Sequence, residues 1–200
     1  WIGNTGNWNN YSNWSSSSGG APQSCIPSPG SFVIFDNNSF SSNDTLYIDK
    51  EAYCKGMSWE SIPSQIVLNG NKDLNINGGI KLHQNLISDF SGNIHFESSQ
   101  PTDTFDIISN GVILNSNIII NGSANRFVKD SLITSSDIVF NSGNFIIKDR
   151  FINASHFLSD TNAVRSLDME KSEIMLTGDS DCWLINNNNI SLIADSSLIK

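Results

Sequence analysis

Charged side chains are scarce in this chain of 200 residues. Asp, Glu, Lys and Arg together make up 16% of it, against about a quarter in a typical globular protein. Basic residues are the scarcer kind, with 11 Lys and Arg against 20 Asp and Glu, which gives a net charge of −9. Without a Lys/Arg cluster to neutralise phosphates, the sequence argues against nucleic acid as a partner and against an anionic membrane surface.

Long hydrophobic runs are also missing. No segment approaches the roughly 18 apolar residues of a membrane-spanning helix, so we expect no membrane insertion. The chain begins at Trp1 and shows no signal-peptide pattern. This indicates either a segment of a longer chain or a chain whose leader has been removed.

Cysteines are few: Cys25, Cys54 and Cys182. None belongs to a CxxC pair and no His spacing completes a zinc site, so we predict no metal and no cofactor. Cys25 and Cys54 could form a disulfide, which would leave Cys182 as a free thiol, and the sequence leaves this pairing open. Such a bond would favour an oxidising, extracellular compartment.

Asn and Ser fill the positions that charged residues leave, at about 30% of the chain. Their side chains compete for backbone hydrogen bonds, which disfavours helices and suits turns and solvent-facing strand positions. The apolar residues are mostly Ile, Leu, Phe and Val, which favour strands. No stretch keeps a helical period, so we expect an all-β protein with few helices.

A short apolar-x-apolar triplet recurs from about residue 66 onward at steps of about 16 to 24 residues, the period of a solenoid coil. The triplets of this first ladder begin at Leu74, Ile94, Ile118, Ile138, Phe157, Ile174 and Ile190. A second ladder follows it at Ile80, Phe105, Phe127, Phe145, Leu167 and Trp183.

Period-2 alternation predicts that the first and third residues of each triplet point inward and the middle residue outward. A Ser lies two places before the first member in four rungs, and we expect it to bond the local backbone at a corner. These four are Ser116, Ser136, Ser155 and Ser172.

The repeat predicts a right-handed parallel β-helix with a Trp-rich N-terminal cap, in which stacked coils share one core. A β-sandwich, which also has many short strands, is the alternative. We expect residues 1–65 to form the cap and its first strands, including Phe32–Phe35 and Leu46–Ile48. Residues 66–200 then form the coils, and their strand-like end predicts that the parent protein continues beyond them.

The N-terminal region carries specific motifs. They are Trp1-x-Gly3-x-x-Gly6-Asn7-Trp8, Ser12-Asn13-Trp14-Ser15, Cys25-Ile26-Pro27, the run from Val33 to Phe40, and Cys54-Lys55-Gly56-Met57-Ser58-Trp59. Over residues 1–60 the chain resembles a β-helical module of large secreted surface proteins and gliding-type adhesins of the Bacteroidota. The resemblance implies a cell-surface or extracellular location, export by the type IX secretion machinery, and a role in adhesion or as a scaffold. It carries over no catalytic residues.

The tryptophans Trp1, Trp8, Trp14 and Trp59 have two interpretations. They can close the open end of the solenoid, where core and strand edges would otherwise be exposed. They can also form an aromatic platform for the sugar rings of a glycan. We favour the cap and keep the platform as the alternative.

Parallel β-helices also support polysaccharide-cleaving enzymes, whose sites need clustered carboxylates and a base. The candidates here are Asp103, Asp106, Asp137, Asp149, Arg150, His83, His95 and His156. Scattered surface groups explain these residues more simply, so we predict that the chain is not an enzyme.

The sequence gives weaker support for other kinds of site. Asp179, Asp181 and the loop from Asp36 to Asp44 have oxygen ligands but lack a Ca²⁺-loop pattern, so we expect no bound ion. Asp44-Thr45-Leu46 and Asp130-Ser131-Leu132 resemble the O-glycosylation acceptor of Bacteroidota, which makes Thr45 and Ser131 candidate glycan carriers.

The predicted function is a non-enzymatic extracellular segment of an adhesin or secreted repeat protein, whose partners are glycans or a surface substratum. The alternative is a carbohydrate-active β-helix enzyme or a glycan-binding module.

Overall fold

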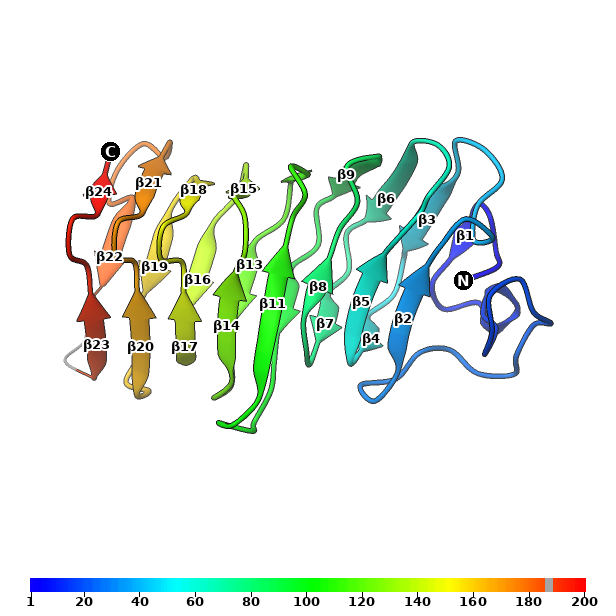
Figure 1. The fold of residues 1–200 in the computed structure, drawn as a ribbon, viewed down its shortest axis with the longest axis horizontal. Coiled ribbons are helices and arrows are strands. Elements are labelled where there is room, and N and C mark those ends of the chain that lie inside the picture. Colours follow the sequence, from blue (N-terminus) through cyan, green and yellow to red (C-terminus); the bar gives the residue numbers. More distant parts are fainter. Residues whose placement is uncertain (186–188) are drawn as a thin grey trace.

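The chain folds into a parallel β-helix, as the sequence predicts (Figure 1). The computed structural model describes residues 1–185 and 189–200. These residues contain 24 short strands and one 3-10 turn, η1 (Tyr11–Asn13), and within them there is no α-helix. All strand pairs are parallel, which excludes the antiparallel pairing of a β-sandwich.

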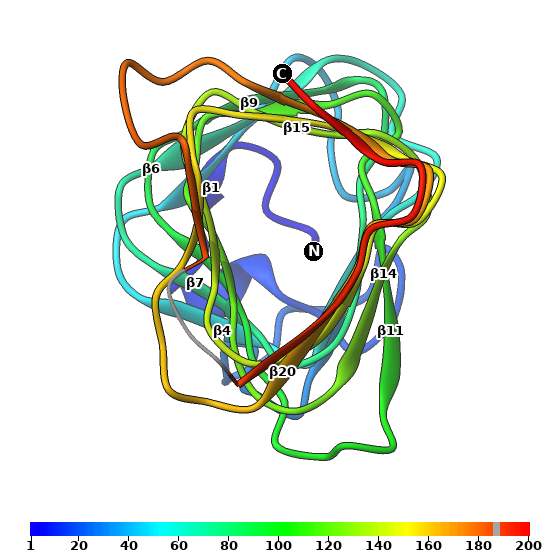
Figure 2. The ribbon, with the colours of Figure 1, turned by 90° about the vertical axis from the view of Figure 1, so that its left-hand side faces the viewer.

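Each coil contributes strands to three faces, and Figure 2 shows the stacked coils along their common axis. The eight-stranded sheet is β2 (Phe32–Phe35), β5 (Gly56–Trp59), β8 (Ile80–Lys81), β11 (Thr104–Ile108), β14 (Asn125–Val128), β17 (Gly143–Ile146), β20 (Arg165–Asp168) and β23 (Ile190–Ile193). The seven-stranded sheet is β4 (Ala52–Cys54), β7 (Leu74–Ile76), β10 (Ile94–Phe96), β13 (Ile118–Ile120), β16 (Ile138–Phe140), β19 (Phe157–Ser159) and β22 (Trp183–Ile185).

The third face consists of two sheets in succession. The first is β1 (Gly6–Asn7), β3 (Thr45–Ile48), β6 (Ile66–Gly70) and β9 (Leu86–Phe90). The second is β12 (Ile113–Leu114), β15 (Leu132–Thr134), β18 (Phe151–Ala154), β21 (Glu173–Leu176) and β24 (Leu198–Ile199). The β2–β23 and β4–β22 sheets run across residue 65 without a break, so coils already begin at β2, inside the segment expected to be a cap and its first strands.

The core is built by the predicted alternation. In β10, Ile94 and Phe96 are buried while His95 between them points outward. Leu74, Ile94, Ile118, Ile138 and Phe157 stack in register through the seven-stranded sheet. The first five rungs of the first ladder are therefore confirmed.

The last rungs of the two ladders are assigned wrongly by the sequence. Trp183 pairs with Phe157 in the seven-stranded sheet, and Ile190 pairs with Arg165 in the eight-stranded sheet. Ile174 lies on the third face, in register with Ile152. Triplets of this kind occur on all three faces, so spacing alone loses the correct face once a loop changes length.

Three of the four corner serines donate to a carbonyl of the preceding coil, whereas Ser155 Oγ contacts His156 of its own coil. Ser116 Oγ donates to the Phe90 carbonyl at 2.8 Å, and Ser172 Oγ donates to the Ile147 carbonyl at 2.7 Å. These acceptors lie 26 and 25 residues earlier in the chain, so the expected local backbone bond is corrected to a bond with the preceding coil. A buried hydroxyl needs a partner, and for Ser116 and Ser172 a carbonyl of the preceding coil supplies it.

Two arginines, Arg126 and Arg165, are buried in the core. Arg126 of β14 donates to the Gly78 carbonyl at 2.7 Å and the Asn77 carbonyl at 3.2 Å, and its guanidinium lies 4.7 Å from the centre of the Phe105 ring. Burial lowers the pKa of Arg126 to about 10. Because residues 77 and 126 belong to different coils, Arg126 ties β14 to the turn before β8. The loop before β11 projects from the stack of coils (Figure 2, green).

Candidate functional site

Asp103, Asp106 and Arg150, candidates for catalysis, lie at separate places on the coils. Asp106 on the outer face of β11 forms an ion pair with Lys129 at 3.2 Å. Asp103 accepts a hydrogen bond from Ser98 at 3.2 Å in the loop before β11. Arg150 donates to the Val128 and Asp149 carbonyls in the turn after β17. These groups are engaged in contacts within and between coils.

Ser155, His156 and Asp137 come together at the corner before the seven-stranded sheet. The Asp137 carboxylate lies 2.7 Å from His156 Nδ1, and Ser155 Oγ lies 3.0 Å from the same nitrogen. A catalytic triad needs the serine and the carboxylate on opposite nitrogens of the ring. The other nitrogen, Nε2, is packed against Gly178, where a Cβ would come within 2.4 Å of it. This arrangement is therefore a structural contact.

The remaining histidines are also engaged. His95 Nε2 lies 3.3 Å from Asp73, and its Nδ1 lies 3.9 Å from Glu97. His83 Nδ1 accepts from the Asn85 backbone amide at 3.2 Å. No cluster of three His, Cys, Asp or Glu residues suited to a metal occurs in residues 1–185 and 189–200.

A polar ladder runs along the corner that precedes the seven-stranded sheet. Asn93 Nδ2 donates to Asp73 at 2.9 Å, Asn117 Nδ2 donates to Asn93 at 3.0 Å, and Asn117 accepts from the Asp137 amide at 3.1 Å. Each member occupies the position just before a strand in its own coil. The ladder satisfies polar groups at the turn and fixes the register of neighbouring coils.

The four tryptophans are packed into one aromatic cap, defined here as Trp1, Trp8, Trp14, Phe35, Phe40 and Trp59. Trp8 and Trp59 are 0% exposed. The Trp59 ring stacks on Phe35 with centroids 4.0 Å apart, and Trp14 meets Trp8 edge to face at 4.8 Å. Buried rings offer no open face to a sugar, so their packing fits the cap and not the platform.

The cysteines are free thiols in the structure, which does not form the Cys25–Cys54 disulfide left open by the sequence. Cys54 is buried in β4, whereas Cys25 is exposed in the loop before β2. Burial raises the pKa of the Cys54 thiol to about 12. Cys182 is half-buried before β22 and donates to the Gly178 carbonyl at 3.1 Å.

The aspartates of the 36–44 loop stabilise the loop itself. Asp44 accepts from the backbone amides of Ser41 and Ser42 and from Thr5 Oγ1 at 2.8 Å. Burial alone would raise the pKa of Asp44, but these hydrogen bonds have the larger combined effect and hold its pKa below the usual value. Asp179 and Asp181 are exposed in the turn after β21.

The two candidate O-glycosylation residues are partly accessible. Thr45 begins β3 and is half-buried, and its backbone amide donates to Thr5 Oγ1 at 3.1 Å. Ser131 precedes β15 and lines an open depression of about 440 Å³ together with His83, Asn110 and Asp130. Glycosylation of either residue stays a prediction.

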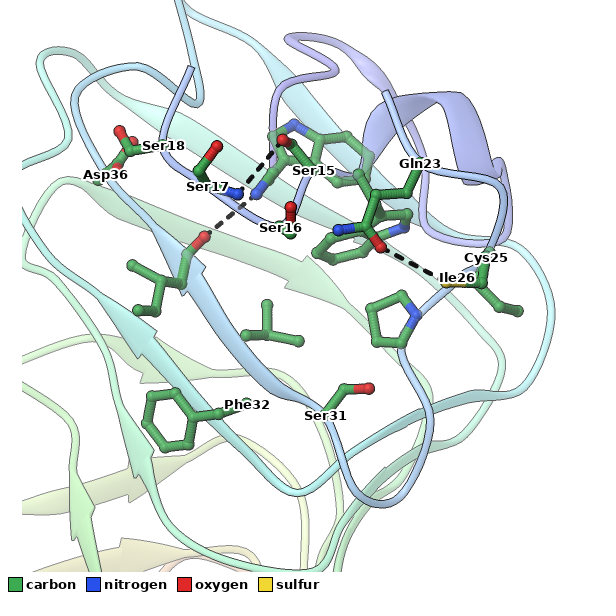
Figure 3. A pocket seen from close by; sticks show the side chains of 15 residues that line it. Ser15, Ser16, Ser17, Ser18, Gln23, Cys25, Ile26, Ser31, Phe32 and Asp36 are labelled. Carbon is green, nitrogen blue, oxygen red and sulfur yellow. Dashed lines mark hydrogen bonds between the residues drawn. The ribbon is translucent and has the colours of Figure 1, made fainter. Parts of the chain in front are cut away.

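A pocket of about 310 Å³ lies between the Ser-rich loop that follows η1 and the outer side of β2 (Figure 3). Hydroxyl and carboxamide side chains line it, including Ser15, Ser16, Ser17, Ser18, Gln23 and Ser31. Its apolar wall contains Phe32 and Ile34, which point outward from β2 and are 61% and 44% exposed. The pocket therefore combines a polar loop with an exposed apolar strand face.

The sequence analysis missed this pocket, although the signals are present. Phe32 and Ile34 alternate with the buried Val33 and Phe35, so two large apolar residues face outward on one strand. A run of four serines, Ser15 to Ser18, precedes them. What the sequence does not contain is the fold of the loop, which brings the serines over β2.

The fold and its contacts define a parallel β-helix repeat protein, an extended scaffold with an aromatic cap at its N-terminal end. Comparisons with protein-family models, with curated proteins and with solved structures found no match to the chain. In residues 1–185 and 189–200, no helix has the length and hydrophobicity needed to cross a membrane.

Proposed function

We propose that the chain is a non-enzymatic, extracellular segment of a cell-surface adhesin or secreted repeat protein, and that it acts as an extended scaffold. The observation that carries this proposal is the use of polar side chains along the coils. Asp73, Asn93, Asn117 and Asp137, which could serve as acids or ligands elsewhere, bond from one coil to the next. Side chains used in this way stabilise a long stack of coils.

The extracellular setting, the type IX secretion machinery and the adhesive role rest on the N-terminal resemblance. The net charge of −9 and the Asn- and Ser-rich surface are compatible with a solvated module outside the cell. An extended stack is suited to holding a binding surface away from its anchor.

Two measurements test the proposal. The chain is incubated with a panel of neutral and acidic polysaccharides, and reducing ends and unsaturated products are measured; we expect no release. Intact cells of the native host are treated with protease and probed with an antibody against this segment; we expect the signal to disappear. Product release, or a signal that resists protease until the cells are lysed, would contradict the proposal.

A further inference from the structure

The outer side of β2 departs from the polar surface expected of a solvent-facing sheet. Phe32 is 61% exposed and Ile34 is 44% exposed, and both lie beside the Ser-rich loop. The neighbouring position on β5, in register with Phe32, is Gly56. A Cβ at Gly56 would lie 2.8 Å from Phe32 Cε2, so the Phe32 ring lies against the backbone of β5. One ring face is thus supported and the rest stays open to solvent.

Besides Phe32, the pocket is lined by loop side chains that both donate and accept hydrogen bonds. Ser16 and Gln23 line the pocket, and the Gln23 side chain accepts one long hydrogen bond, from the Cys25 thiol at 3.5 Å (Figure 3). Ser31 closes the far end and is held by Ser28 at 3.1 Å. Hydroxyl and carboxamide groups match the alternating donors and acceptors of a sugar.

Charge selects among ligands of this size. No Lys, Arg or His side chain lines the pocket, so none of its side chains forms an ion pair with a carboxylate, sulfate or phosphate. The Trp1 main-chain nitrogen donates to the Ile34 carbonyl at 3.2 Å, and the one charged side chain in the lining is the Asp36 carboxylate. Burial raises the pKa of Asp36, and hydrogen bonds from Ser18, the Asn38 amide and Ser39 hold it below its usual value. The ionised Asp36 and the net charge of −9 both disfavour anions.

We propose that this pocket binds a neutral sugar, namely an uncharged pyranose at the end of a glycan, with the open face of Phe32 as the stacking surface. Its volume of about 310 Å³ lies at the small end of ligand sites and accommodates one or two rings. Phe32 supplies apolar contact to the ring carbons, while Ser16 and Gln23 bond the hydroxyls. The proposal deepens the adhesin function, on which it rests for its biological setting.

The test uses the 15N-labelled chain and the methyl glycosides of glucose, galactose, mannose and N-acetylglucosamine, followed by amide NMR. We expect at least one of them to shift the amides of Ser16, Gln23 and Phe32, with a dissociation constant on the order of 1 mM. Glucuronate is the charged probe, and we expect it to bind at least fivefold more weakly. Failure of all four glycosides to shift these amides would overturn the proposal.

Variants locate the contact. Phe32→Ala removes the stacking surface, and we expect binding to weaken at least fivefold. Tyr47→Ala is the matched control, because Tyr47 is an exposed aromatic residue on β3 outside the pocket; we expect no change. Gln23→Ala, a loop substitution away from the strands, is expected to weaken binding even if Phe32→Ala disturbs β2. Unchanged binding in both pocket variants, or equal binding of glucuronate, would overturn the site.

The sugar-binding proposal and the scaffold proposal can fail independently of each other. Cleavage of a polysaccharide would remove the non-enzymatic role and leave sugar binding at the pocket intact. Absence of binding at the pocket would leave the scaffold role intact.

Discussion

The two ends of the β-helix differ in how far their apolar side chains are buried. At the N-terminal end, the aromatic cap buries Trp8, Phe35 and Trp59 completely. At the C-terminal end, β22, β23 and β24 are the outermost strands of their sheets, and Leu192 and Leu198 are each 47% exposed. Within these 200 residues the first coil is therefore covered by the aromatic cap, whereas apolar side chains of the last coil are exposed.

This difference shows what a terminal coil needs. An inner coil has its backbone groups paired and its core residues covered by a neighbour on each side. The first coil gains this cover from a loop folded over the axis, in which Trp14 Nε1 donates to the Trp8 carbonyl at 2.7 Å. Unpaired strand edges with apolar residues are sites for association, so we expect the open end to be the less stable and more adhesive of the two.

The largest expected effect comes from opening the closed end. Trp59→Ala removes a fully buried ring that stacks on Phe35, and we expect a loss of about 3–5 kcal/mol in the free energy of unfolding. Trp183→Ala removes a half-buried ring from the last coil, and we expect about half that loss. Guanidinium unfolding followed by circular dichroism compares the two variants. Equal losses would show that the ends are equally packed.

The next effect depends on pH. The pKa of Cys54 is raised to about 12 in the fold, above its ordinary value of 9.0. Its contribution to stability is therefore complete below pH 9 and is lost as pH rises toward 12, because the unfolded chain ionises first. Between pH 7 and pH 11 we expect the original chain to lose about 2–3 kcal/mol more of its free energy of unfolding than the Cys54→Ala variant loses.

Unfolding measured at pH 7 and pH 11 provides the comparison. Cys182→Ala, at the half-buried cysteine of the open end, is the control and is expected to follow the original chain. If Cys54→Ala loses as much stability with pH as the original chain, Cys54 is not buried as described.

A third effect concerns association. We expect the 200-residue chain to self-associate through its last coil, and Leu198→Glu to weaken this at least tenfold, which is about 1.4 kcal/mol. Sedimentation velocity over a concentration series measures it. Ile87→Glu places the same charge on an exposed position of the third face, in β9, and should leave association unchanged. Equal effects of the two variants would move the contact away from the open end.

The smallest effect lies between the two ends. Asn117→Ala breaks two links of the polar ladder, to Asn93 and to the Asp137 amide. We expect a loss of about 1 kcal/mol, measured by the same guanidinium unfolding. Ser196→Ala, an exposed hydroxyl near the C-terminal end, is the control and should change little. An Asn117 variant as stable as the original chain would show that the polar ladder does not stabilise the fold.

The sequence predicts the fold because its signal is local and repeated. The triplets at Leu74, Ile94 and Ile118 keep the same inward and outward order, and the structure stacks them in register. The swap of Trp183 and Ile190 between ladders marks the limit, since a triplet does not say which face it joins. Arg126 was unexpected because its partners Asn77 and Gly78 are distant in sequence.

The candidate site was predicted less well than the fold. The four tryptophans pack together at the N-terminal end, and their burial favours the cap over the platform. The pocket beside Phe32 depends on how the loop through Ser16 and Gln23 folds over β2, and no periodic pattern encodes that. Loop placement results from many weak contacts, so it has to be seen in the structure.

Native-state hydrogen exchange along the 200-residue chain tests the central claim most directly, namely one continuous β-helix whose first coil is covered by the aromatic cap and whose last coil, in this chain, is exposed. We predict strong protection of the amides in β5, β7 and β10, with protection falling through the last coil to its lowest values in β23 and β24. Equal protection of β24 and β5, or weak protection of β5 beneath the aromatic cap, would contradict it.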